Sequence, residues 1–354
     1  METSRRSFFR KALAAGGGAA ALGLGAFGAK LGWDYQHFML PDDWGIRRYE
    51  GLSRALGKGD GHLDVFKLSR VLWDQDQRAR EYGTPIWGFG GEVWRGTIWK
   101  QEFWNAGRTS TVNYDRLVDY RLVRPVDYTI FSDVSRIKWI RAELKSHLRS
   151  VGERYSGLPN TFKLDCIFAY KTTGHTGSHI SAVMGLQRAI APLFFKDSIA
   201  YVISTHYKCR QHSRLVRLLI EKVNPVLAGI ETTAGGPALP MRAANFYKFL
   251  PYWLAIGKQL VRKTSREFFG RSLLAEDPSE AATYPLTHWR QITLDCIDQD
   301  HLLNHAQMRS GCLYDAERLK DFLQRARTEE FDQETLLSRV VTVEMALRSV
   351  GASF

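Results

Sequence analysis

The chain has 354 residues and a formal net charge of +12 at neutral pH, with 44% hydrophobic and 24% charged residues. This composition excludes a disordered protein and fits one large domain or two modest ones. The positive charge favours anionic partners such as nucleotides. No clustered basic stripe typical of a nucleic-acid-binding module is present, so we expect no nucleic-acid partner. After the N-terminal segment, no run of residues is apolar enough to form a stable membrane span.

The first 29 residues are typical of a bacterial twin-arginine export signal. Arg5 and Arg6 precede Phe8 and Phe9, and an uncharged stretch rich in Ala and Gly runs from Ala12 to Ala29. As a helix this stretch would extend about 27 Å, just short of the ~30 Å hydrocarbon core, which suits a removable signal better than an anchor. We therefore expect a signal at 1–29, a folded part at 30–354 and a periplasmic location. The alternative is a basic helix followed by a Gly-rich linker.

Helical periodicity dominates from Asp43 onward. The spacing predicts helices over Trp44–Leu56 and Val65–Tyr82, with Gly83 as the C-terminal cap of the second. Thr84–Trp87 is a short strand-like run that ends in a glycine turn, after which Glu92–Asn105 resumes as a helix. A strand, a glycine turn and a helix with an acid in its first turn are typical of the ligand-binding edge of an α/β sheet.

The chain beyond residue 105 is predicted to be nearly all helical. Ser132 or Asp133 is expected to cap a long helix, and Asn224-Pro225 to end another, because proline disfavours helix in the residue before it. The four cysteines form no CxxC pair and are expected to be buried thiols. The predicted helices are Asp115–Leu122, Val134–Arg154, Cys166–Tyr170, Ser178–Ile190, Ser213–Val223, Asn245–Lys263, Asp315–Ala326 and Glu334–Val350, and Glu276–Ala281 is a polar connector.

The glycine turn is the sharpest local signal for chemistry. Gly88, Gly90 and Gly91 would let backbone N–H groups approach a phosphate, and Glu92 would place a carboxylate there to hold Mg²⁺ or orient a reacting group. The alternative interpretation is structural. A tight turn followed by an acid that favours the start of a helix would produce the same spacing.

The turn also carries a resemblance to a known family. Residues 88–96 resemble the second signature of asparagine synthase-like synthetase domains, those of the glutamine-hydrolysing asparagine synthetases, in which a strand ends in a Gly-rich acidic turn followed by an aromatic residue and a glycine. Further stretches resemble the family in the same order along the chain, so that the likeness covers the chain from Leu31 to its end. These stretches are Leu31–His37, Gln187–Asp197, Arg217–Pro225 and Thr233–Pro237.

The resemblance implies an α/β fold that is predominantly helical, with a partial ATP-pyrophosphatase-type domain and a helical C-terminal region. Such domains use ATP and Mg²⁺ to adenylate a carboxylate substrate, and an amine then displaces AMP. Gly88, Gly90, Gly91 and Arg95 would lie against the nucleotide or pyrophosphate, and Glu92 would be the catalytic acid.

Departures from the family pattern predict an incomplete enzyme. The S-G-G-x-D-S loop that cradles the ATP pyrophosphate is absent, the turn keeps one acid instead of two, Phe89 stands where many members have an acid, and there is no glutaminase domain. We expect the isolated chain to be inactive unless a companion chain supplies the missing loop. An active ligase of this kind needs cytoplasmic ATP, so an exported chain is expected to be catalytically silent.

Two other functions remain open from the sequence. The first is an exported, non-enzymatic helical protein that offers an interaction surface. The second is a metal-dependent hydrolase, because His175 and His179, and likewise His301 and His305, are i, i+4 pairs that a helix would place on one face. There is no HExxH motif, and hydrogen-bonded histidines are the more common reason for such pairs.

Overall fold

The computed structural model describes residues 40–123, 126–185, 187–232, 235–269, 274 and 286–352. This part of the chain is predominantly helical, which confirms the helical component of the expected fold class. It forms two compact units, which we call the main unit (40–208 and 286–352) and the inserted unit (209–274). The signal-like segment, the stretch Leu31–His37 and the connector Glu276–Ala281 lie outside the described residues.

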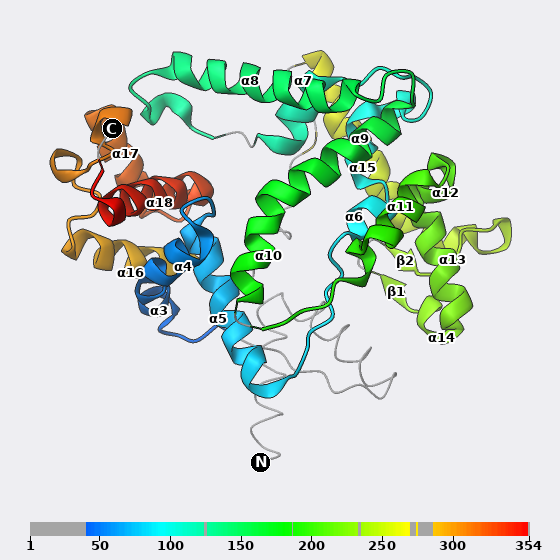
Figure 1. Cartoon of the computed structure of the whole chain (residues 1–354), viewed down its shortest axis with the longest axis horizontal. Coiled ribbons are helices and arrows are strands. Elements are labelled where there is room, and N and C mark those ends of the chain that lie inside the picture. Colours follow the sequence, from blue (N-terminus) through cyan, green and yellow to red (C-terminus); the bar gives the residue numbers. More distant parts are fainter. Residues whose placement is uncertain are drawn as a thin grey trace. The chain divides into compact units, whose positions relative to one another are not determined.

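The main unit is built from helices (Figure 1). Its described residues contain no strand, only the isolated bridges between Ile86 and Ile190 and between Phe131 and Tyr314. Its elements are α3 (Trp44–Glu50), α4 (Leu52–Gly59), α5 (Val65–Glu81), α6 (Gly91–Trp94), η1 (Thr97–Asn105), α7 (Tyr114–Leu117), η2 (Val118–Leu122), η3 (Tyr128–Ile130), α8 (Val134–Glu153), α9 (Asn160–Lys171), η4 (Thr172–Thr176), α10 (Gly177–Met184), η5 (Pro192–Phe194), α11 (Lys196–Ser204), α16 (Leu286–Gln299), η9 (His305–Gln307), η10 (Gly311–Leu313), α17 (Ala316–Arg325) and α18 (Glu334–Val350).

Local capping explains where the best-predicted helices begin and end. The carboxylates of Asp64, Asp133 and Asp315 accept hydrogen bonds from backbone N–H groups in the first turns of α5, α8 and α17. At the other end of the chain, Gly351 takes a left-handed conformation and closes α18 with a bond to the carbonyl of Arg348. These helices match the predicted ranges to within one or two residues.

Other predicted elements are corrected by the structure. The helix expected over Glu92–Asn105 breaks at Gly96, whose φ of +59° ends α6 and starts the 3₁₀ helix η1. Gly83 does not cap α5, because the preceding Tyr82 already leaves the helix in an extended conformation. The strand expected over Thr84–Trp87 is reduced to one parallel bridge between Ile86 and Ile190.

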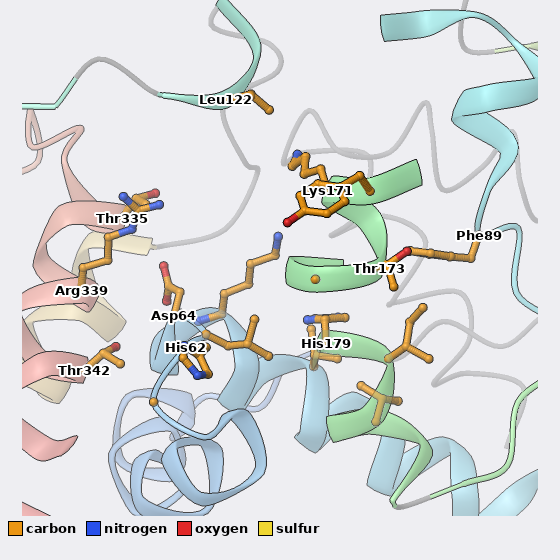
Figure 2. Close-up of a pocket in the computed structure, with 18 of the residues that line it drawn as sticks. His62, Asp64, Phe89, Leu122, Lys171, Thr173, His179, Thr335, Arg339 and Thr342 are labelled. Carbon is orange, nitrogen blue, oxygen red and sulfur yellow. Dashed lines mark hydrogen bonds between the residues drawn. The ribbon is translucent and has the colours of Figure 1, made fainter. Parts of the chain in front are cut away.

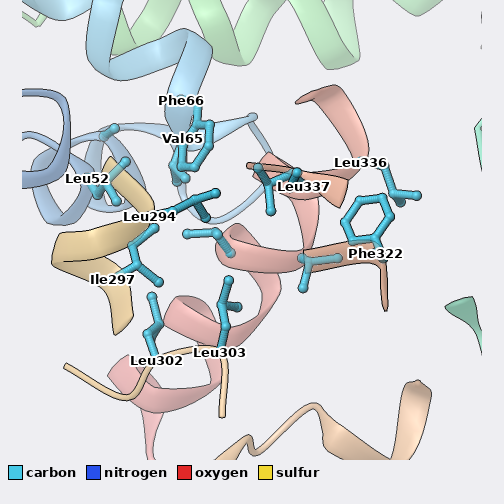
Figure 3. Close-up of a cluster of buried hydrophobic side chains, with 14 of the residues drawn as sticks. Leu52, Val65, Phe66, Leu294, Ile297, Leu302, Leu303, Phe322, Leu336 and Leu337 are labelled. Atoms are coloured by element: carbon cyan, nitrogen blue, oxygen red, sulfur yellow. The ribbon is translucent and has the colours of Figure 1, made fainter. Parts of the chain in front are cut away.

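Two apolar clusters hold the main unit together. The larger one joins α4, α5, α16, α17 and α18, where Leu52, Leu337 and Phe322 are essentially inaccessible to solvent (Figure 3). The smaller one joins η1, α7, α8 and α9, with Trp99, Leu117 and Leu164 at its centre. The Trp99 indole N–H donates to the carbonyl of Thr161 and to Asp165, so the buried ring has partners for its polar edge.

The inserted unit is organised around Arg217, which is buried and lies over the rings of Phe249 and Tyr252. Its guanidinium donates to the carbonyls of Pro237 and Leu239, which fixes the loop that follows the small sheet. The elements are η6 (Gln211–Ser213), α13 (Arg214–Val223), α14 (Pro225–Ala228), the antiparallel strands β1 (Glu231–Thr232) and β2 (Gly236–Pro237), η7 (Ala243–Phe249) and α15 (Leu250–Phe269), and α12 (Tyr207–Arg210) precedes them.

The four cysteines form no disulfide. None of the four is fully buried, contrary to expectation: Cys166 and Cys296 are half-buried, and Cys209 and Cys312 are exposed. Burial raises the pKa of the Cys166 thiol to about 11. Among the described residues, no helix combines the length and the apolar character needed to cross a bilayer.

Candidate functional site

The glycine turn packs against a distant stretch of the chain. The backbone N–H of Trp87 donates to the carbonyl of Ile190 at 2.8 Å, and the indole N–H of Trp94 donates to the carbonyl of Leu193 at 3.2 Å. The Phe89 and Phe194 rings meet edge to face, 5.3 Å apart. Residues 88–96 and 187–197 are therefore neighbours in the main unit.

The residues predicted for nucleotide binding lie around this turn and are not among those that line the cleft described below. Glu92 and Arg95 are exposed on α6, and the Arg95 Nε donates to the carbonyl of Gly91. Gly88 has no neighbouring atom within 4 Å of the position that a Cβ would take, whereas Gly90 is pressed against the carbonyl of Leu193. The close approach at Gly90 is thus explained by packing within the protein, and the ligand-binding roles of the five residues stay predictions.

Replacing Gly90 by alanine is expected to destabilise the main unit by about 1–3 kcal/mol. Gly90 has a φ of +89°, and an added Cβ would lie 2.9 Å from the Leu193 carbonyl oxygen. Gly88→Ala is the matched control and should change stability by less than about 0.5 kcal/mol. Urea unfolding of both variants measures the difference. Equal effects for the two would contradict the packing explanation.

A separate cleft of about 1450 Å³ opens in the main unit (Figure 2). Lys67, Val71 and Gln75 line it from α5 at i, i+4 and i+8, so they share one helix face. Thr335, Arg339 and Thr342 line it from α18 with the spacing of one face as well. The third side comes from the end of α9, η4 and α10, and the rest from α8 and from Leu122, Trp87 and Phe89.

The cleft is rich in positive charge. Lys67, Lys171 and Arg339 line it together with three histidines, against a single carboxylate, that of Asp64. Figure 2 shows Asp64, His62 and Arg339 on one side, with Lys171 and His179 nearer the middle. Asp64 caps α5 by accepting from the Lys67 backbone N–H at 3.0 Å, and it also accepts from the Ser338 hydroxyl. The residue types in the cleft therefore favour an anionic ligand.

The lining of the cleft also includes aromatic rings and one buried polar group without a hydrogen-bond partner in the described part of the chain. Trp87 and Phe89 line the cleft, and Phe89 lies opposite Asp64 and Arg339 in Figure 2. The Gln75 side chain lines the cleft too, is only 9% exposed, and its Oε1 has no hydrogen-bond partner among the described residues. A buried acceptor without a partner is costly to the folded state.

The cleft histidines do not form a metal centre with the acids around them. His147 Nε2 lies 2.8 Å from the Tyr170 hydroxyl, and the two rings are 5.3 Å apart. Within the described ranges, no group of three or more His, Cys, Asp or Glu side chains is placed to hold a metal ion.

The structure separates the members of one of the two predicted histidine pairs. His301 has a φ of +52° and His305 belongs to a separate 3₁₀ helix, so this pair does not share a helix face. His179 lies near the start of α10 and lines the cleft, while the side chain of His175 lies outside the described part of the chain.

The sequence alone did not indicate that Lys67, Gln75 and Arg339 line a cleft. The one available signal is Gln75, a polar residue at helical spacing from the apolar Leu68 and Leu72 of the helix Val65–Tyr82. Lys67 and Arg339 stand at exposed positions of their helices, so no pattern marks them. Comparison with protein families, with curated proteins and with solved structures found no match to this chain.

Proposed function

We propose that the main-unit cleft binds a ligand of the nucleotide class. Its phosphates lie near Lys67, Lys171 and Arg339, and its base lies near Trp87 and Phe89. The observation that carries this proposal is the gathering of three basic side chains, Lys67, Lys171 and Arg339, in one cavity that has a single lining carboxylate. Phosphates pair with lysine and arginine. Trp87 and Phe89 supply flat apolar surface for the ring.

The same proposal accommodates the resemblance to asparagine synthase-like domains. In that view the chain is an incomplete ATP-dependent amide-forming ligase, of ATP-pyrophosphatase type, that binds nucleotide and carboxylate substrate but needs a companion chain for catalysis. The packing of residues 88–91 on residues 190–194 supports it, because two stretches that the family keeps in order are also neighbours here. If the first 29 residues direct export, the cleft would instead serve a non-enzymatic binding role outside the cytoplasm.

The cleft residues do not fit a magnesium ion held by the protein. Magnesium needs several oxygen ligands, and the single lining carboxylate, Asp64, is already engaged with the Lys67 backbone and Ser338. We therefore propose that Mg²⁺ enters as a complex with the phosphates of the nucleotide and is held mainly by them. Lys67 and Arg339 would then pair with the phosphate oxygens that the metal leaves uncovered.

Calorimetric titration of the purified chain with Mg-ATP tests the proposal, together with an assay for AMP. We expect binding with a Kd of roughly 10–100 µM, about −7 to −5.5 kcal/mol, and no AMP. Adenosine and tripolyphosphate alone should each bind more weakly than ATP, because each would occupy one side of the cleft. Absence of binding at millimolar ATP would overturn the cleft proposal, and steady AMP formation would overturn the incomplete-enzyme proposal.

A further inference from the structure

The inserted unit carries an exposed apolar stripe along one helix. Leu250, Leu254 and Val261 of α15 are 53%, 67% and 46% exposed. At 3.6 residues per turn they fall within an arc of roughly 40°. The preceding η7 extends the surface with Tyr247, which is 65% exposed, and Phe246, which is 48% exposed and stacks on Trp253. Such a run of large apolar side chains on one surface indicates an interaction site.

The charged residues within η7 and α15 near this stripe are basic. Lys258 is exposed beside it on α15, and Lys248 lies over the Tyr247 ring. No Asp or Glu occurs in the sequence between Glu231 and Glu267, whereas Lys and Arg recur throughout this interval. A helix with an apolar face, flanking basic residues and nearby aromatic rings has the features that place helices in the plane of a membrane interface.

We infer that η7 and α15 of the inserted unit dock onto an anionic lipid surface. The apolar stripe enters the boundary between headgroups and acyl chains, Tyr247 lies at headgroup level, and Lys248 and Lys258 contact the acidic headgroups. A second copy of the chain is a poorer occupant. A symmetric pairing of α15 would bring like charges together with no acidic residue from Thr232 to Arg266 to offset them.

Flotation of the full chain with lipid vesicles tests this inference. The chain is expected to float with vesicles of phosphatidylcholine and phosphatidylglycerol, and to remain in solution with phosphatidylcholine alone. Because each basic residue near the surface contributes modestly, Lys258→Gln should weaken partitioning roughly fivefold. Leu254→Glu, which places a carboxylate in the apolar stripe, should weaken it by roughly tenfold or more.

The matched control is Ile140→Glu, which alters an exposed apolar residue on α8 of the main unit. This variant should float like the unchanged chain. Circular dichroism of each variant verifies that it is folded. Equal flotation of the Leu254→Glu variant and the unchanged chain would overturn the inference. The inference would also be overturned if light scattering showed a stable dimer that Leu254→Glu dissociates, and if neither this variant nor the unchanged chain bound vesicles.

Discussion

Replacing Glu344 by alanine should lower the free energy of unfolding of the main unit by about 3–5 kcal/mol. The Glu344 side chain is fully buried in α18 and accepts from the Ser310 backbone N–H at 3.0 Å, the Ser310 hydroxyl at 2.8 Å and the Arg309 N–H at 3.1 Å. It also pairs with Arg348 at 2.7 Å. Removing it leaves buried donors without an acceptor, which costs more than the bonds themselves contribute.

Urea unfolding measures this change, and hydrogen exchange of the backbone amides in α18 locates it. Glu330→Ala is the control, since Glu330 is an exposed carboxylate of the same unit and its loss should matter by less than about 0.5 kcal/mol. A loss below about 1 kcal/mol for Glu344→Ala would show that the network adds little to stability.

The same carboxylate makes the stability depend on pH. Burial acts to raise the pKa of Glu344, but the hydrogen bonds from Ser310, Arg348 and Arg309 outweigh it, so the pKa is lowered. A group whose pKa is lower in the folded state contributes its stability above the unfolded pKa of about 4.3 and loses it as the pH falls further. The unchanged chain should therefore lose more stability than Glu344→Gln in that acidic range.

Replacing Arg339 by glutamine should weaken Mg-ATP binding roughly 10- to 150-fold, because a hydrogen bond to a charged phosphate contributes about 1.5–3 kcal/mol. Arg339 is exposed on the cleft face of α18, and no other side chain in the described part of the chain is shown bonding it. Lys67→Gln on the opposite helix should weaken binding in the same direction, by a smaller factor, because a lysine acts as a point charge rather than a fork.

Arg95→Gln is the control that separates the two candidate sites. Arg95 is the exposed arginine that the family resemblance assigns to the nucleotide, and it lies outside the cleft lining. If the cleft is the site, the Kd for Mg-ATP should be unchanged in this variant. A loss of affinity in Arg95→Gln alone, with Arg339→Gln behaving like the unchanged chain, would move the site to the glycine turn.

Local signals account for the parts of the fold that the sequence predicted well. α8, α17 and α18 each begin at a recognisable polar residue and keep one apolar face, so their ranges depend on nearby residues only. The break at Gly96 was missed because a glycine inside an apolar pattern does not reveal its φ. The start of α9 after Pro159 was missed too, since its first turns carry polar residues that are buried here.

The candidate site could not be predicted because it is assembled from distant segments. Lys67 and Arg339 come from helices that are more than 200 residues apart in the chain, and the periodicity of each helix says nothing about which face meets which partner. The sequence did single out the glycine turn, and one member of it, Phe89, does line the cleft. Gly90 and Gly91 pack on Leu193, whereas Gly88 has no neighbour within 4 Å of the position that a Cβ would take.

Photolabelling with an azido derivative of ATP tests directly whether the main-unit cleft binds the nucleotide. If the cleft binds the nucleotide, the label falls on cleft residues such as Trp87, Phe89 or Tyr170 and is displaced by excess ATP, and Arg339→Gln lowers the labelling yield. Peptide mass spectrometry locates the modified residues. A displaceable label confined to Glu92 and Arg95, or to residues 209–274 of the inserted unit, would contradict binding in the cleft.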